Sequence, residues 1–169
     1  MKIETYIERY DPCLSSIPFL RKFDAFEDAW KKCPRGDWML SAAKLLEVDI
    51  RALTLAKGLC ANTVRHLMED QRSIPAVDAA IAFGRGEIDE EELRDYAHTA
   101  AAAAAAAYAA AYAAAADAAD AAAAAAAAAY EAADSDPVSA LRESRKQTAD
   151  ICREVLTGAV MEKLAKENK

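Results

Sequence analysis

The stretch "AHTAAAAAAAAYAAAYAAAADAADAAAAAAAAAYEAADSDP", residues 97–137, decides the fold. Alanine is the strongest helix former because it loses no side-chain entropy on entering a helix, and no glycine interrupts the tract before Pro137. One helix starting at Asp89 and running through the tract would be about 67 Å long, whereas a break at Asp117 or Asp120 would give two. We favour the single helix, because a left-handed end on alanine is costly. The tract therefore predicts an all-α fold, a helical bundle with a long alanine-rich central helix or helix pair.

The side chains other than alanine lie on one half of this helix when successive residues are placed about 100° apart. They are Tyr108, Tyr112, Tyr130, His98, Asp120, Glu131 and Asp117. The other half is bare alanine, against which neighbouring helices can pack closely. Two interpretations of the half that bears the tyrosines stay open. Its side chains line a pocket, or the tyrosines fill the space that small residues leave.

The rest of the chain repeats apolar residues at helical spacing, with capping and breaking residues between the repeats. This pattern predicts helices over residues 19–32, from Asp37 as N-cap to residue 46, from Asp49 as N-cap to about residue 69, from Ser73 and Pro75 to the glycines at 84–86, from a capping box of Asp89 and Glu92 into the alanine tract, and from Pro137 to about residue 164. We expect one all-helical domain over residues 1–169. It comprises an N-terminal extension (1–18), a half of short helices (19–86), and the alanine-rich helix with the C-terminal helix (87–169).

Composition excludes several classes of protein. A formal charge of −7 argues against non-specific binding to nucleic acid, which depends on clustered Lys and Arg. The four cysteines and two histidines show no metal-ligand spacing, so we expect no metal, no cofactor, and four buried thiols in a reducing compartment. There is no signal-peptide pattern and no uninterrupted apolar run of about 18 residues. We therefore expect a cytoplasmic protein that does not enter a membrane.

The sequence has no motif typical of nucleotide-binding loops, hydrolase nucleophiles or zinc proteases, which favours a protein without catalytic activity. The strongest polar cluster lies in "CANTVRHLMEDQR", where the spacing i, i+3, i+4 and i+7 predicts one helix face bearing Asn62, Arg65, His66 and Glu69. Together with Arg72, this face would suit a phosphate or carboxylate. The alternative is a solvated face with an internal Arg–Glu pair.

Trp38 is a further candidate for ligand binding, although Trp30 and Trp38 are more typical of core packing.

The order of several segments resembles a known family. Trp30 and Cys33 precede "GDWML", and "CANTVRHLMEDQRS", "AVDAAIAFGRGEI", the alanine tract and "ADICREVL" follow. This order is similar to that of an alanine-rich family of immunity proteins found beside bacterial polymorphic toxins and in phage genomes. The resemblance covers roughly residues 23–156.

The resemblance implies a small cytosolic protein that neutralises a protein toxin by binding, without catalysis. In phage members the same logic implies blocking of a host defence effector or sequestration of an anionic, nucleotide-like immune signal. A third interpretation is a structural module that forms a homo-oligomer through its alanine face. The acidic charge fits a basic protein partner, whereas the cluster of Arg65, His66 and Arg72 fits an anionic small molecule.

Overall fold

The computed structural model is all-α and describes residues 1–68, 73–103 and 137–167. Its elements are α1 (Ile3–Tyr10), α2 (Ile17–Leu20), α3 (Phe26–Lys32), α4 (Gly36–Leu45), α5 (Ile50–Asn62), the 3₁₀ turn η1 (Arg65–Leu67), α6 (Ser73–Arg85), α7 (Glu90–Ala103) and α10 (Pro137–Glu167). Within these ranges there is no strand, only an isolated antiparallel bridge between Lys2 and Ala25. None of the described helices is both long enough and apolar enough to span a bilayer.

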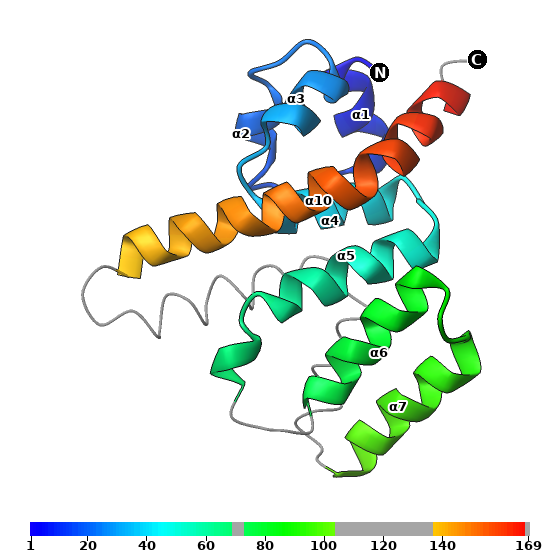
Figure 1. Ribbon diagram of the computed structural model, residues 1–169. Helices are drawn as coiled ribbons and strands as arrows, with labels where there is room; N and C mark the ends of the chain where they lie inside the picture. The colour runs from blue at the N-terminus through cyan, green and yellow to red at the C-terminus, as the bar shows by residue number, and fades with distance from the viewer. Residues whose placement is uncertain (69–72, 104–136, 168–169) are drawn as a thin grey trace.

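The described part of the molecule is organised around α10 (Figure 1), which packs against α3, α4 and α5. Its buried stripe recurs at spacings of three and four, as expected for a helix that buries one face. The most deeply buried apolar members of this stripe, each at most 1% exposed, are Ala149, Cys152, Leu156, Val160 and Leu164. Val138, at the start of α10, is 58% exposed.

The central position that we expected for the alanine helix is thus held by α10 in the part of the chain that is described. The described start of the alanine tract forms the end of α7, and α7 packs against α6. Residues 104–136 lie outside the described ranges, and with them the length of the alanine helix, the choice between one helix and two, and its pairing with α10.

The N-terminal region differs from the prediction in two ways. Residues 1–18, expected as an extension, form α1 and begin α2, and Ile3 and Tyr6 are 3% and 1% exposed within the core. The helix expected over residues 19–32 is broken between α2 and α3. The backbone N–H of Ile3 donates to the Asp24 carbonyl at 3.0 Å, and that of Phe26 donates to the Met1 carbonyl at 2.9 Å. These long-range bonds replace helical bonds that residues 21–25 would otherwise make.

Local capping was predicted well at three helix ends. Asp49 accepts a hydrogen bond from the backbone N–H of Ala52 at 3.0 Å. In the predicted capping box, the Asp89 N–H donates to Glu92 Oε2 at 3.0 Å and the Glu92 N–H donates to Asp89 Oδ1 at 2.9 Å. Pro137 is the first residue of α10, as expected.

The expected N-cap role of Asp37 was wrong. Helix α4 begins one residue earlier, at Gly36, so Asp37 lies in its first turn and forms an ion pair with Arg35. Gly36 approaches α10 so closely that a Cβ atom there would lie 2.6 Å from Thr148 Cβ. Helix α4 can therefore begin at this point only on a residue without a side chain.

Helices α5 and α6 cross with their backbones in close contact. A Cβ atom at Gly58 would lie 2.9 Å from Ile81 Cγ1, and one at Gly84 would lie 2.4 Å from Leu55 Cβ. The glycines thus bring the end of α5 and the turn η1 beside α6.

Candidate functional site

The predicted polar face around Arg65 does not form as a continuous helix surface. Helix α5 ends at Asn62, and Arg65 and His66 lie in the separate turn η1. The reason is local: the N–H groups of Thr63 and Val64 bond to carbonyls three residues back, at 3.2 Å each, so the chain tightens out of the α-helix. Glu69 and Arg72 lie outside the described residues, so the expected Arg–Glu pair and the second guanidinium have no described geometry.

Arg65 is engaged within the chain. Its Nη1 and Nη2 donate to Asp78 Oδ1 at 2.5 Å and to Asp78 Oδ2 at 2.9 Å, a two-pronged pair between η1 and α6. Asn62 and His66 are exposed. Asp78 therefore accepts hydrogen bonds from both Nη1 and Nη2 of Arg65. The guanidinium that was a candidate for binding an external anion already has a carboxylate partner within the chain.

The tyrosine-rich half of the alanine tract has no described geometry. Tyr108, Tyr112, Tyr130 and Asp120 lie outside the described residues. His98 lies within α7, but its side chain is not among those described. Whether this half is a pocket or a packing surface therefore stays a prediction.

Trp38 and Trp30 have different surroundings. Trp30 is 2% exposed, and its Nε1 donates to Thr157 Oγ1 at 3.0 Å, so it belongs to the core. Trp38 is half-buried; the Arg35 guanidinium carbon lies 4.4 Å from its ring centroid, and the Phe19 ring lies 5.7 Å away. Its Nε1 donates to Ser15 Oγ at 3.3 Å. Trp38 therefore stands at the edge of the N-terminal helices with one face covered by a cation.

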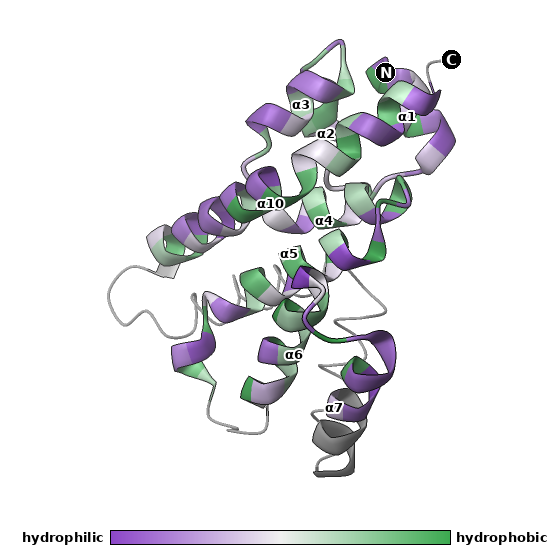
Figure 2. Ribbon diagram, turned by 45° about the vertical axis from the view of Figure 1, so that its right-hand side comes forward, coloured by the Kyte–Doolittle hydropathy of each residue, from purple (hydrophilic) through white to green (hydrophobic). Residues whose placement is uncertain are grey.

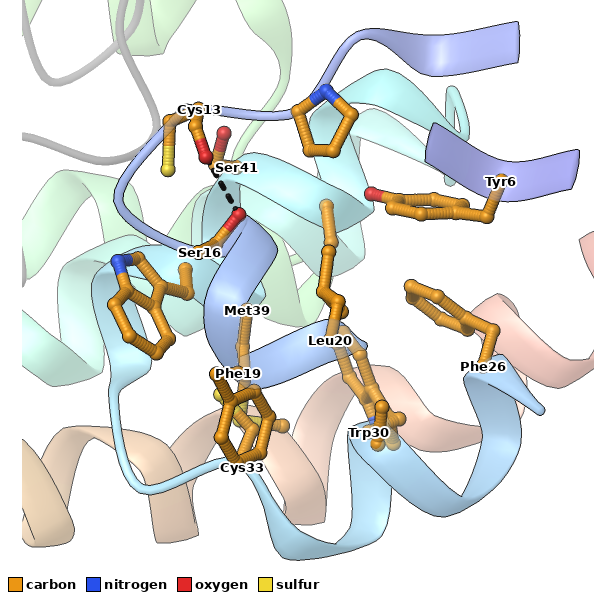
Figure 3. Close-up of a pocket in the computed structure, with 14 residues that line it drawn as sticks. Tyr6, Cys13, Ser16, Phe19, Leu20, Phe26, Trp30, Cys33, Met39 and Ser41 are labelled. Atoms are coloured by element: carbon orange, nitrogen blue, oxygen red, sulfur yellow. Dashed lines mark hydrogen bonds between the residues drawn. The ribbon is translucent and has the colours of Figure 1, made fainter. Parts of the chain in front are cut away.

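A small cavity lies beside Trp38, between the N-terminal helices and α4 (Figure 3). Its volume is about 30 Å³, which is room for only a few water-sized groups. Most of its wall is apolar. The lining residues are Tyr6, Pro12, Cys13, Ser16, Phe19, Leu20, Phe26, Ala29, Trp30, Cys33, Trp38, Met39, Ser41 and Ala42.

Tyr6 supplies the most unusual polar group of this wall. Its side chain is 1% exposed, and its hydroxyl has no hydrogen-bond partner among the described residues. Leaving a buried hydroxyl unpaired costs about 1–3 kcal/mol. Burial, followed by the nearby Tyr10 and Cys13, raises the pKa of Tyr6 well above its usual value, so the hydroxyl keeps its proton.

Cys13 lies at the exposed side of the cavity and corrects one expectation. We expected four buried thiols, but Cys13 is exposed, and only Cys33, Cys60 and Cys152 are buried. Burial acts to raise the pKa of the Cys13 thiol, but hydrogen bonds with Ser15 and Ser16 outweigh it and lower the pKa. The Cys13 carbonyl accepts from Ser16 Oγ at 2.8 Å, which holds the loop in place.

Sequence reasoning missed this cavity because Tyr6, Cys13 and Ser16 lie in the segment assigned as an extension. One signal was present: Ile3, Tyr6, Ile7 and Tyr10 follow the spacing i, i+3, i+4 and i+7 of an amphipathic helix. The spacing could have identified α1 as a core helix. It could not have shown that the Tyr6 hydroxyl ends in a cavity.

No family model, no curated protein and no solved structure matches this chain. Across the described residues, no three side chains of His, Cys, Asp or Glu are grouped as a metal site would require. The resemblance to immunity proteins accordingly stays a prediction from the order of the sequence segments.

Proposed function

We propose that the chain is a non-enzymatic binding protein that neutralises a toxin or an immune effector by covering a basic surface of that protein. The observation that carries this proposal is an acidic patch, defined as residues 87–95, at the start of α7. It contains Glu87, Asp89, Glu90, Glu91, Glu92 and Asp95, all of them exposed. Figure 2 shows hydrophilic residues over most of the segment that leads into α7 and over the first turn of α7.

Local helix chemistry accounts for only part of this acidity. Carboxylates in the first turn interact favourably with the helix dipole, and Asp89 and Glu92 are used in the capping box. Asp95 lies beyond the first turn and forms no ion pair with another described residue. Glu91 precedes it by four residues, so the two like charges share a face and destabilise the helix by about 0.2–0.5 kcal/mol. A cation from a partner would relieve this repulsion.

An aromatic side chain stands next to the patch. Tyr96 is 49% exposed, which is high for a large ring on the described surface. Interfaces commonly combine an aromatic anchor with complementary charge, the anchor supplying affinity and the charge supplying speed and selectivity of association. The patch together with Tyr96 has this composition.

The contacts support a protein partner better than an anionic nucleotide. Arg65, the best candidate for a phosphate ligand, is neutralised by Asp78. The cavity of about 30 Å³ is about tenfold smaller than the smallest pockets typical of ligands of nucleotide size. Sequestration of a nucleotide is tested directly by denaturing the purified protein and analysing the supernatant for released nucleotide.

The experiment is a test of protection. The chain is co-expressed in bacteria with toxins or effectors encoded beside its gene, and cell growth and binding of the purified pair are measured. The variant Glu91→Lys/Asp95→Lys reverses two charges of the patch. The matched control Glu8→Lys/Glu154→Lys makes the same change of net charge at two other exposed positions, on α1 and α10.

We expect the wild type and the control to protect, and the patch variant to lose protection and at least about tenfold in affinity. Affinity of the wild type should also fall as the salt concentration rises. Equal protection by the patch variant would overturn the assignment of the surface. Turnover of nucleotides, peptides or esters by the purified protein would overturn the proposal as a whole.

A further inference from the structure

The cavity beside Trp38 contains one buried hydrogen-bond donor, the Tyr6 hydroxyl, that has no partner among the described residues. The Tyr6 ring is held by Phe26 and Tyr10, whose ring centroids lie 4.3 and 5.2 Å from it. Figure 3 shows the hydroxyl pointing from α1 into the space enclosed by the lining side chains. The hydroxyl therefore cannot turn away to another partner without breaking this packing.

The other walls define what could accept from this donor. Leu20, Phe26 and Met39 are buried apolar side chains, and none of the described residues that line the cavity is Lys, Arg, Asp or Glu. A charged ligand would lose its hydration without gaining an opposite charge, so the cavity selects against ions. Ser16 Oγ already donates to the Cys13 carbonyl, so Tyr6 is the buried donor that remains for a ligand.

We propose that this cavity binds a neutral molecule of about two to four non-hydrogen atoms, of the short-chain alcohol or ketone class, whose oxygen accepts a hydrogen bond from the Tyr6 hydroxyl. The apolar part of the molecule lies against Leu20, Phe26 and Met39. This site is separate from the acidic patch of α7, and the inference does not rest on the proposed function.

The size limit follows from the volume of about 30 Å³. A molecule with a branched or longer carbon chain would have to displace the surrounding rings, and a packed interior resists such displacement. Binding should therefore show a size cut-off within a homologous series. A general effect of organic solvent on the protein would have no such cut-off.

The experiment uses the two tryptophans as reporters, because both line the cavity and the chain has no others. Their indole N–H signals are followed by NMR while the full-length protein is titrated separately with methanol, ethanol, acetone and tert-butanol. We expect saturable shifts with the smaller molecules and only a linear drift with tert-butanol.

Two variants probe the site. Tyr6→Phe removes the hydroxyl and keeps the ring, and we expect it to weaken binding at least about tenfold, the effect of losing a well-formed hydrogen bond. The matched control Tyr10→Phe removes a hydroxyl that donates to Glu167 and does not line the cavity, and it should bind as the wild type does. Ala42→Val narrows the cavity with Tyr6 intact and should abolish binding, whereas Ala52→Val, on α5 and away from the cavity, should not.

Circular dichroism of each variant establishes that it is folded, and the second pair keeps the test decisive if either tyrosine variant unfolds. Linear drift with every probe would overturn the proposal and leave the cavity to water alone. Saturable binding that is equal in the wild type, Tyr6→Phe and Ala42→Val would also overturn it, because the binding would then occur elsewhere.

Discussion

Because α5 and α6 cross closely, we expect Gly84→Ala to destabilise the protein, whereas helix propensity alone would predict that it stabilises it. Gly84 lies in α6, next to its last residue, Arg85. Replacing glycine by alanine inside a helix normally stabilises a protein by about 1 kcal/mol. At Gly84, however, the added Cβ atom would lie 2.4 Å from Leu55 Cβ, 2.7 Å from Leu55 Cα and 2.8 Å from Leu55 N.

The size of the effect follows from which atoms are in the way. Two of the three are backbone atoms of α5, which cannot rotate aside as the end of a side chain could. The two helices would have to separate by roughly 1 Å to restore contacts of about 3.5–4.0 Å, which loosens the packing along the whole crossing. Overpacking of this kind costs about 1–3 kcal/mol, and the gain in helix propensity is smaller near a helix end. We expect Gly84→Ala to lower the free energy of unfolding by about 1–3 kcal/mol.

Gly158 provides the matched control. It is exposed in the middle of α10, and a Cβ atom there would meet no atom of the described residues within 4 Å. Gly158→Ala should therefore raise the free energy of unfolding by about 0.5–1 kcal/mol. Both variants are compared with the wild type by urea denaturation followed by far-UV circular dichroism. A Gly84→Ala variant as stable as Gly158→Ala would refute the close crossing.

Three further predictions concern the electrostatics and the helix ends. Burial raises the pKa of Cys33 from 9.0 to about 11, so the stability that its neutral thiol contributes is full below about pH 9 and is lost as the pH rises through 11. In urea denaturation with reductant present, the free energy of unfolding of the wild type should fall by up to about 1.4 kcal/mol per pH unit in this window, and that of Cys33→Ala should fall less. Equal falls in the two proteins would show that Cys33 is not the group responsible. Asp49→Ala should lower the free energy of unfolding by about 1 kcal/mol because it removes the cap of α5. Asp49→Ser, which can still cap the helix, should retain most of the wild-type stability in the same assay. Glu47 has a left-handed φ of 51°, so Glu47→Gly should stabilise the protein by about 1 kcal/mol, and a destabilised variant would show that its side chain has a role of its own.

The features that sequence reasoning predicted correctly depend on residues close together in the chain. The cap at Asp49 spans three residues, and so does the capping box of Asp89 and Glu92. Proline at position 137 begins a helix because its missing N–H is not needed in a first turn. Helicity itself follows from propensity and from the spacing of apolar residues, which require no knowledge of the partner surface.

The errors arise where distant segments compete with local preference. The spacing of Phe19, Phe23 and Phe26 is helical, yet the backbone between α2 and α3 bonds with residues 1–3 instead. Arg65 was predicted either to bind an anion or to pair with a glutamate of its own helix, but it pairs with Asp78 on α6. A one-dimensional pattern contains no information on which of two favourable bonds is compatible with the rest of the packing.

The sequence by itself determined that this protein is all-α, where several of its helices begin, and that it carries an excess of negative charge. Those properties are sums of local terms: helix propensity, capping bonds within a few residues, and the count of charges. Only the tertiary structure decided that α1 belongs to the core, that α5 and α6 touch at Gly84, and that the Tyr6 hydroxyl ends in a cavity with no partner among the described residues. Each of these depends on the distance between atoms far apart in the chain, which is set by the simultaneous packing of all the helices and not by any one of them.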